Sequence, residues 1–452
     1  MRGASLWVGT ALAGTLLILP TGALAQQSNA ALEARVRELE AALMSVKAEM
    51  AANRQAETAR EAQREQRIIT LETKPSPAPP APATPPPIEN GFRIGSTVVN
   101  YGGFVKLDAT VSDFNRADPP VGDAIRDFYI PGSIPVTGAS EDAKVDLNAR
   151  QTRFWFTTTG TVGGMKVGSR VEGDFQVLPG AGDQRTTSPS NFSLRRAYVT
   201  VDKWLFGQEW SNFQNVGVLP ETADYIGPSE GTVFVRQAQV RYTHGPFSVS
   251  MENPESTVTP FGGGTRIVTD DSSIPDFTAR FDLKKPFGDF AIAGLVRQVS
   301  IQQGALNSDV TGWGVSASGK IKFGKRDDLR FMVTTGEGIG RYVGLNFAND
   351  AVVDASGELK AIPLTAGFAA YRHYWSTDVR STLMYSMQTV DNDQALTGAA
   401  ANKEATSIRA NLVWSPIKGL DIGAEYSVAE RELQSGITGD LRRLQAFAKY
   451  GF

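Results

Sequence analysis

The chain of 452 residues has no cysteine, only two histidines and no apolar run of the roughly 18 residues that a membrane-spanning helix needs. Without cysteine it cannot form disulfide bonds, thiolate metal sites or a cysteine nucleophile. The net charge of −3 and the pI of about 5.7 give no basic excess for nucleic acid. The mean hydropathy of −0.20 is too low for a helical membrane protein. The composition therefore excludes nucleic-acid binding, a helical membrane protein and thiol chemistry.

The first 25 residues have the pattern of an export signal. Arg2 supplies the positive start, an apolar stretch runs from Leu6 to Pro20, and Ala23-Leu24-Ala25 forms a small-residue cleavage pattern. The alternative is a membrane anchor, but the apolar stretch is short and no basic residues follow it. We therefore predict a cleaved signal peptide over 1–25.

Residues 26–73 are predicted to form a helix, because the stretch 32–72 has no proline or glycine and is rich in alanine, glutamate and arginine. Its apolar side chains recur at alternating spacings of four and three residues, which is the seam of a coiled coil. We predict self-association, although the mixed seam does not select a number of helices and a lone solvated helix is the alternative. The seam residues are Leu32, Val36, Leu39, Leu43, Val46 and Met50.

Residues 74–90 are predicted to be a linker. Eight prolines within 74–89 exclude helix and sheet and favour the extended polyproline II conformation. At roughly 3.1 Å per residue the linker spans about 50 Å. The remaining residues, 91–452, then form a separate domain.

From residue 91 onward polar and apolar side chains alternate, as in a β-strand whose two faces meet different environments. In YGGFVKLDATV (101–111), Val105 and Leu107 share one face while Lys106 and Asp108 point to the other. About sixteen such strands follow one another up to the last residue. Because charged residues occupy the second face of many strands, we expect no second apolar layer and no core inside the domain.

The lengths of the connections between these strands distinguish a membrane barrel from a soluble one. Every second connection is short, such as DK, HGP and STD, and the others are long, such as 113–144 and 338–360. Outer-membrane barrels have short periplasmic turns, longer outer loops and an even number of strands. The last strand ends on Phe452, as barrel closure requires. We therefore predict an all-β fold, a 16-stranded antiparallel transmembrane β-barrel over 91–452, with the α-helical coiled coil in the periplasm.

Three stretches resemble the DcaP-type porins of Gram-negative outer membranes: LRRAYVTVDKWLFGQEWSNF (194–213), VFVRQAQVRYTHG (233–245) and DIGAEYSVAERELQSGITGDLRRLQAFAKYGF (421–452). The order of signal, coiled coil, linker and barrel is similar too. The resemblance implies a homotrimer surrounded by outer-membrane lipid and lipopolysaccharide. It also implies a diffusion porin for small, often anionic solutes such as dicarboxylates, with the loops as the part where substrate choice diverges.

Strand parity predicts which arginines face the lumen, because a basic side chain facing lipid at mid-membrane costs roughly 2–4 kcal/mol. Phe154 and Phe156 should face lipid, which places Arg153 inside. Arg195 has lipid-facing parity near an outer end, where we expect it to extend to the interface. The predicted pore-lining, substrate-binding arginines are Arg153, Arg170, Arg196, Arg280, Arg297 and Arg409.

Such a set of arginines favours anions, since a guanidinium group can bind a carboxylate through two hydrogen bonds. The alternative is that the lumenal charges pair with one another and only keep the lumen hydrated. The loop 212–231 occupies, by resemblance, the position of the inward loop of general porins. If it folds inward, Glu221, Asp224 and Tyr225 would narrow the pore. The two acids would then face the arginines and create an electric field across the lumen. If it stays outside, it is an ordinary surface loop.

Two other classes of function remain to be weighed. An enzyme would need a histidine-centred site, but His244 and His373 fall at strand ends without a plausible nucleophile beside them. The FGGGT stretch (261–265) lacks the lysine and the spacing of a phosphate loop. We therefore expect no catalysis, cofactor or metal. The second class is a barrel that only anchors an envelope-tethering or adhesive coiled coil, with peptidoglycan as its candidate partner.

Overall fold

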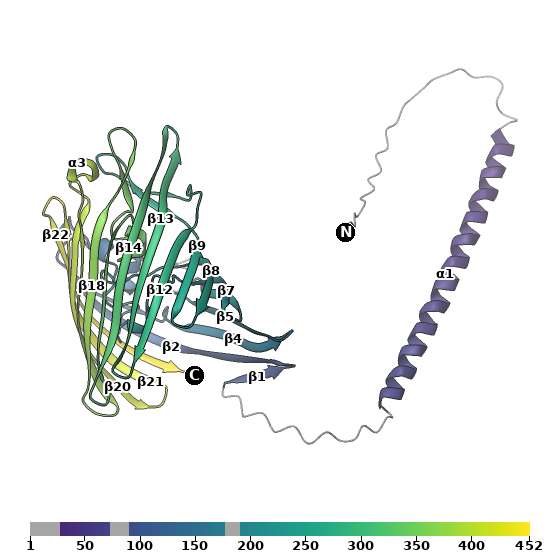
Figure 1. Ribbon diagram of the computed structural model, residues 1–452, viewed down its shortest axis with the longest axis horizontal. Coiled ribbons are helices and arrows are strands. Elements are labelled where there is room, and N and C mark those ends of the chain that lie inside the picture. Colours follow the sequence, from purple (N-terminus) through teal and green to yellow (C-terminus); the bar gives the residue numbers. More distant parts are fainter. Residues whose placement is uncertain (1–27, 73–89, 177–189) are drawn as a thin grey trace, which may run out of the picture. The chain divides into compact units, whose positions relative to one another are not determined.

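The computed structural model describes residues 28–72, 90–176 and 190–452, which fall into two units divided after Pro86. The first unit contains one continuous helix of 45 residues, α1 (Ser28–Glu72) (Figure 1). Leu43 and Met50 of the predicted seam are 56% and 54% exposed, so the coiled coil stays a prediction that needs a second helix. No helix among the described residues is both long and apolar enough to cross a membrane. The predicted signal peptide and nearly all of the predicted linker lie outside the described residues.

The second unit is a closed β-barrel of sixteen antiparallel strands, which confirms the predicted fold (Figure 1). The first and last strands pair from Phe104 opposite Gly451 to Phe114 opposite Leu441, and this pairing closes the barrel. Two short segments, β3 and β4, both pair with β2 and together form the second strand. The barrel strands are β2 (Thr97–Phe114), β3 (Lys144–Asn148) with β4 (Arg153–Val162), β5 (Met165–Asp174), β6 (Ser193–Val201), β7 (Trp204–Trp210), β8 (Arg236–His244), β9 (Phe247–Glu252), β12 (Asp276–Lys285), β13 (Gly288–Gln303), β14 (Leu306–Phe323), β15 (Asp327–Glu337), β18 (Pro363–Tyr374), β19 (Val379–Val390), β20 (Asn402–Ile417), β21 (Leu420–Leu433) and β22 (Thr438–Gly451).

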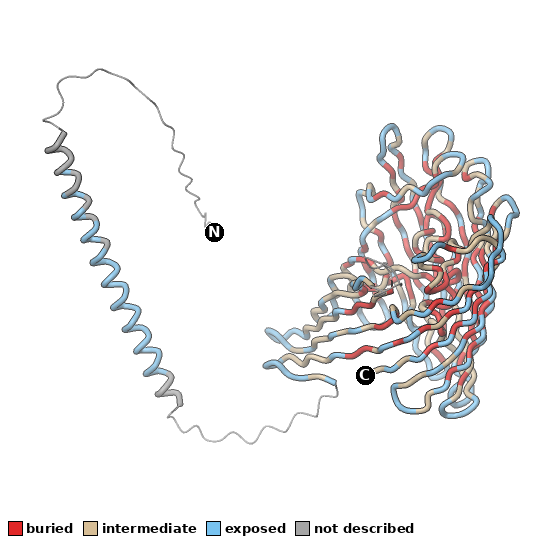
Figure 2. Tube along the Cα trace, turned by 180° about the vertical axis from the view of Figure 1, so that it is seen from behind, coloured by how far each residue is buried: buried red, intermediate tan, exposed pale blue. Residues whose placement is uncertain are grey.

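Burial alternates along the barrel strands because successive side chains point to opposite faces (Figure 2). On β22, Leu444 and Tyr450 are about half exposed and face outward, whereas Arg443 and Gln445 are buried inside. The chain end is fixed by backbone hydrogen bonds between Phe452 and Gly103 of β2. No strand edge is left unpaired at the closure, as a hydrocarbon environment requires.

The two ends of the barrel differ, since one carries tight turns and the other carries the long connections with their own structure. A short strand, β1 (Gly91–Ile94), pairs with the start of β2. A second sheet of four strands in the order β11-β10-β16-β17 belongs to the long connections. The elements of the long connections are α2 (Ala124–Asp127), η1 (Pro131–Ser133), η2 (Val216–Val218), β10 (Ser256–Thr259), β11 (Ile267–Thr269), η3 (Gly340–Tyr342), β16 (Ala351–Val353), β17 (Leu359–Ala361) and α3 (Gln394–Thr397).

The inside of the barrel contains an apolar core, so the expectation that it would have none was wrong. Phe213 from one long connection and Phe347 from another are 1% and 2% exposed, and both belong to the largest buried cluster. The wall contributes apolar inward side chains to the same cluster, among them Leu295, Met332 and Phe368. Part of the wall is therefore apolar on its inner face because loops, not water, cover it.

Candidate functional site

The connection between β7 and β8, residues 211–235, lies inside the barrel and is called the crossing loop here. Its tip at Ala223 meets the wall opposite to its own strands. The Ala223 carbonyl accepts hydrogen bonds from Lys106 Nζ (2.6 Å) on β2 and Gln445 Nε2 (3.1 Å) on β22. The Ala223 amide donates to Glu425 (3.1 Å) on β21. The loop therefore reaches across the lumen.

Inward polar side chains of the wall explain why an irregular segment can lie there. A backbone inside a membrane protein needs hydrogen-bond partners wherever it lacks secondary structure. Asn411 donates to the carbonyl of Glu221 (2.9 Å), and Arg280 donates to the carbonyl of Gln214 (2.8 Å). At Gly231 the loop approaches the wall so closely that its amide donates to Ser386 Oγ (3.0 Å). The wall side chains thus replace the partners that a strand or helix would supply.

The three loop residues that the sequence singled out contact the wall at three different places. The Glu221 carboxylate lies 2.6 Å from Arg380 Nη2 on β19. The Asp224 carboxylate lies 3.1 Å from Arg409 Nη1 on β20. The Tyr225 hydroxyl donates to Asp174 (2.9 Å) on β5, and its ring packs 5.2 Å from that of Phe128 in the first long connection. These contacts attach the loop to both sides of the lumen.

The inner faces of β4, β5 and β6 carry four arginines, called the arginine wall here: Arg153, Arg170, Arg195 and Arg196. All four have a nitrogen within 4 Å of the Glu172 carboxylate, at 3.8, 2.7, 3.1 and 3.3 Å respectively. Arg153 and Arg195 also pair with Asp174, and Arg196 pairs with Glu209. Among the described residues, these four guanidinium groups share three carboxylates, which leaves the wall with an excess of positive charge.

The prediction that Arg195 faces the lipid interface was wrong, because β6 contains a β-bulge. Arg196 is opposite Glu172 and Leu194 is opposite Gly173, so Arg195 is the extra residue between two consecutive pairs. A bulge turns an additional side chain to the same face of the sheet. Arg195 is therefore 2% exposed and lies inside, beside Arg196. Strict alternation could not reveal this.

Arg236 at the start of β8 was not among the predicted site residues. Its guanidinium lies over the rings of Trp210 (4.8 Å) and Phe234 (6.0 Å). It interacts electrostatically with Asp174 and Arg153, so it adds to the positive charge of the arginine wall. Its parity is opposite to that of the buried Gln237 and Gln239, so alternation alone places it on the outer face.

The other three predicted arginines have different surroundings. Arg280 lies 2.5 Å from Asp282 on its own strand and also holds the crossing loop at Gln214. Arg297 and Arg409 point inward as their parity predicts, but each is only 1% exposed because loops cover it. This burial removes both from the side chains that a solute could touch, and the prediction that they line the open pore is corrected accordingly.

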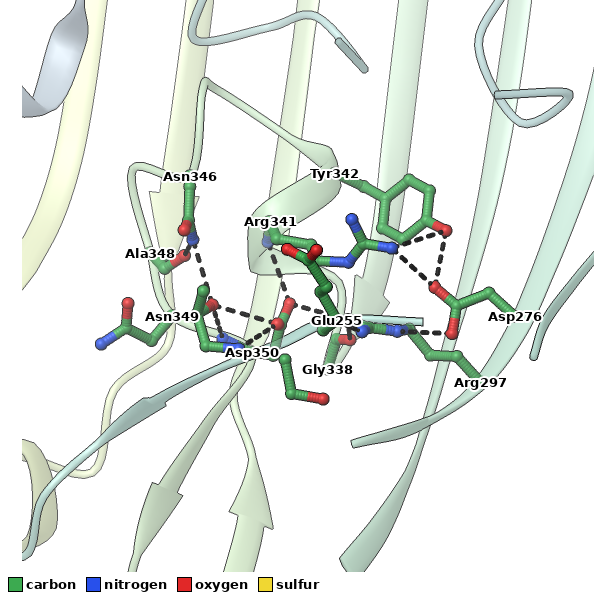
Figure 3. Close-up of polar contacts among 12 residues, drawn as sticks. Glu255, Asp276, Arg297, Gly338, Arg341, Tyr342, Asn346, Ala348, Asn349 and Asp350 are labelled. Carbon is green, nitrogen blue, oxygen red and sulfur yellow. Dashed lines mark hydrogen bonds and ion pairs between the residues drawn. The ribbon is translucent and has the colours of Figure 1, made fainter. Parts of the chain in front are cut away.

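Arg297 is the centre of a buried network that fixes the connection 338–350 to the wall (Figure 3). Its Nε lies 3.2 Å from Asp276 and its Nη1 lies 3.0 Å from Asp350, while Gly338 accepts a hydrogen bond at 3.1 Å. Tyr342 donates its hydroxyl proton to Asp276 (2.7 Å). Burial raises the pKa of Tyr342 well above its ordinary value, so it stays a donor. The network is structural rather than lumenal.

The two histidines lie near short turns and take part in rim contacts. His373 Nδ1 lies 2.7 Å from Asp327, and His244 Nδ1 lies 2.7 Å from Lys203. Within the described ranges, no group of three or more histidine, aspartate or glutamate side chains is arranged to hold a metal ion.

A closed sixteen-stranded barrel with an apolar outer face, a charged lumen and an inward loop defines an outer-membrane porin, which is a channel. The model of the DcaP outer membrane protein family matches residues 92–452. The chain therefore belongs to the DcaP outer membrane protein family, and the resemblance stated from the sequence is confirmed.

Solved structures agree with this assignment. The outer membrane channel DcaP of Acinetobacter baumannii is 26% identical, with a TM-score of 0.68, and the match covers 80% of this chain and all of that one. OmpF of Salmonella typhi, solved in complex with daunomycin, has a TM-score of 0.50 at 10% identity, over 80% of this chain and all of that one, and supports the fold alone. No curated protein sequence gives a significant match to the chain.

Proposed function

We propose that this porin is a passive diffusion channel for small hydrophilic solutes and prefers anions such as dicarboxylates. The observation that carries the proposal is the arginine wall, where four guanidinium groups surround Glu172 and outnumber the carboxylates that they share. A basic lining raises the local concentration of anions in a pore. No reaction and no energy coupling are involved, and flux follows the concentration gradient.

The side chains that carry this preference are those that keep some exposure to the lumen. The side chains of Arg153, Arg170 and Arg196 are 21%, 22% and 20% exposed, so a solute can reach them. Each is already bound to a carboxylate, which weakens its hold on a passing anion. Weak binding suits a channel, because conduction requires fast release. Glu221, Asp224 and Tyr225 narrow the passage by holding the crossing loop in the lumen.

The segments before the barrel bear on assembly and location. We infer that residues 1–25 are removed on export, that 26–73 form a periplasmic coiled coil, and that 74–90 link it to the barrel at 91–452. The coiled coil supports a homotrimer, because a seam of apolar residues needs partner helices. Outer-membrane lipid and lipopolysaccharide surround the barrel. Tethering to peptidoglycan through the coiled coil is a secondary role that needs no open lumen.

The test is the reversal potential of purified protein in a planar bilayer under a salt gradient, with succinate added to one side. We expect anion selectivity and brief blocking by succinate. Replacing Arg153, Arg170 and Arg196 with glutamine should shift the reversal potential toward cation preference. Arg442→Gln is the matched control, because Arg442 is exposed outside the barrel and should leave selectivity unchanged. Cation-selective wild-type channels would contradict the anion preference, and folded barrels without conductance would favour the tethering role.

A further inference from the structure

Glu230 is the most unusual acidic side chain of the crossing loop. It is 0% exposed, and neither of its carboxylate oxygens makes a hydrogen bond of ordinary geometry among the described residues, although the hydroxyl groups of Ser386, Ser407 and Tyr129 approach the carboxyl group. A buried ionised carboxylate without a partner is very costly, so such groups take up a proton instead. The other two acids of the crossing loop, Glu221 and Asp224, are both ion-paired. Glu230 therefore needs a separate explanation.

The surroundings of Glu230 come from the crossing loop, the first long connection and two wall strands. Next to it in the chain, Gly231 donates its amide proton to Ser386 Oγ on β19. Ser386 and Ser407 face its carboxyl group. The titratable and charged groups that face it are Tyr129 and Arg409.

Arg409 offsets the charge of an ionised Glu230 only in part, because its Nη1 atom is shared between two other carboxylates, while its Nε and Nη2 atoms have no hydrogen-bond partner among the described residues. Its Nη1 lies 3.1 Å from Asp224 and 3.5 Å from Glu425, and its guanidinium lies 4.4 Å from the centre of the Tyr129 ring. The distance from Arg409 to Glu230 exceeds that of an ion pair, since none is formed within 4 Å.

Burial raises the pKa of Glu230, and the charge of Arg409 offsets only part of this effect. The raised pKa makes the stability of the packed loop depend on pH. A group whose pKa is raised in the packed state favours that state at low pH, and this contribution is lost as the pH rises through the raised pKa. The ionised carboxylate is better solvated in water, which it reaches only when this part of the loop leaves its place.

We propose that Glu230 makes the position of the crossing loop depend on pH: the protonated carboxyl group keeps the loop packed against β19 and β20, and ionisation releases the loop and widens the passage. The proposal rests on the proposed channel function for its electrical readout, but the movement itself can be measured separately. The released fraction grows about tenfold for each pH unit above the raised pKa, until other contacts of the loop limit it.

The test compares the single-channel conductance of the full-length protein with that of Glu230→Gln at about pH 6 and at about pH 9. Glutamine has the shape of the protonated acid and cannot ionise. We expect single-channel conductance to rise with pH in the wild type and to stay constant in Glu230→Gln. Glu255→Gln is the matched control, because the carboxyl group of Glu255 is exposed, and it should keep the wild-type pH dependence.

Hydrogen exchange of residues 211–235 is the second readout, with the variants compared at the same pH. We expect faster exchange in the wild type than in Glu230→Gln at the higher pH and equal exchange at the lower pH. Equal exchange at both pH values would overturn the proposal even if the channel conducts. Absent conductance together with the expected exchange difference would instead contradict the channel function and leave the pH-dependent movement standing.

Discussion

Arg297→Met should release the connection 338–350 from the wall, and the structure supplies the size of the effect. Arg297 lies between two carboxylates, Asp276 and Asp350, and all three side chains are 0% exposed. Removing one partner from a buried ion pair costs about 3–5 kcal/mol, because the remaining charge is left without compensation. Here Asp276 keeps Arg341 at 3.0 Å, whereas Asp350 loses its ion pair. We therefore expect a loss of about 3–5 kcal/mol.

Two further variants separate charge from packing in this prediction. The double variant Arg297→Met and Asp350→Asn removes one charge of each sign and leaves the pair between Asp276 and Arg341 intact, so it should recover much of the loss, since buried ion pairs replaced as a whole often cost little. Lys403→Met breaks an ion pair whose lysine side chain is 46% exposed to solvent, so it should hardly change the stability.

The assay is equilibrium unfolding in detergent micelles, combined with hydrogen exchange of residues 338–350. Arg297→Met should unfold at lower denaturant and exchange faster in that connection. If Arg297→Met were as stable as Lys403→Met, the network would not fix the connection and our reasoning would be refuted. If the double variant were less stable than the single one, the cost would come from lost hydrogen bonds and not from uncompensated charge.

Two other predictions concern the crossing loop and an outer loop. Gly231→Ala places a Cβ atom 2.3 Å from the carbonyl oxygen of Gly367, so the loop must shift; we expect a loss of about 1–3 kcal/mol in unfolding experiments. Gly217→Ala in the same loop meets no backbone atom within 4 Å and should be nearly neutral, and equal losses would contradict the close approach. Asp354 accepts hydrogen bonds from the hydroxyl and the amide of Ser356, which hold its pKa at about 2. Because the ionised form is the stabilised one, amide protection in this turn should persist down to about pH 4 and disappear as the pH falls toward 2, whereas Asp354→Asn should lack that dependence.

The sequence predicts the barrel well because period-two alternation and loop length follow directly from strand geometry and from the lipid around it. Alternation along the strand was enough to predict that Arg153 and Arg170 point inward. Arg195 escaped prediction because a single bulge shifts the parity, and no local residue marks that bulge. The burial of Arg297 and Arg409 depends on loops from distant parts of the chain, which a strand-by-strand reading cannot place.

The acidic side chains of the crossing loop are not the source of an electric field across the lumen. The sequence suggested that acids on the crossing loop would face the arginines across open space. Instead Glu221 and Asp224 are paired at 2.6 and 3.1 Å with Arg380 and Arg409 on the opposite side of the lumen. Charges compensated at such short range contribute little field at a distance. Two groups of wall side chains keep an excess of positive charge among the described residues. One is the arginine wall, and the other contains five basic side chains that share Asp328, Glu221 and Asp421: Lys320, Arg330, Arg372, Arg380 and Lys449. We therefore infer that these two groups set selectivity while the loop determines the width of the passage.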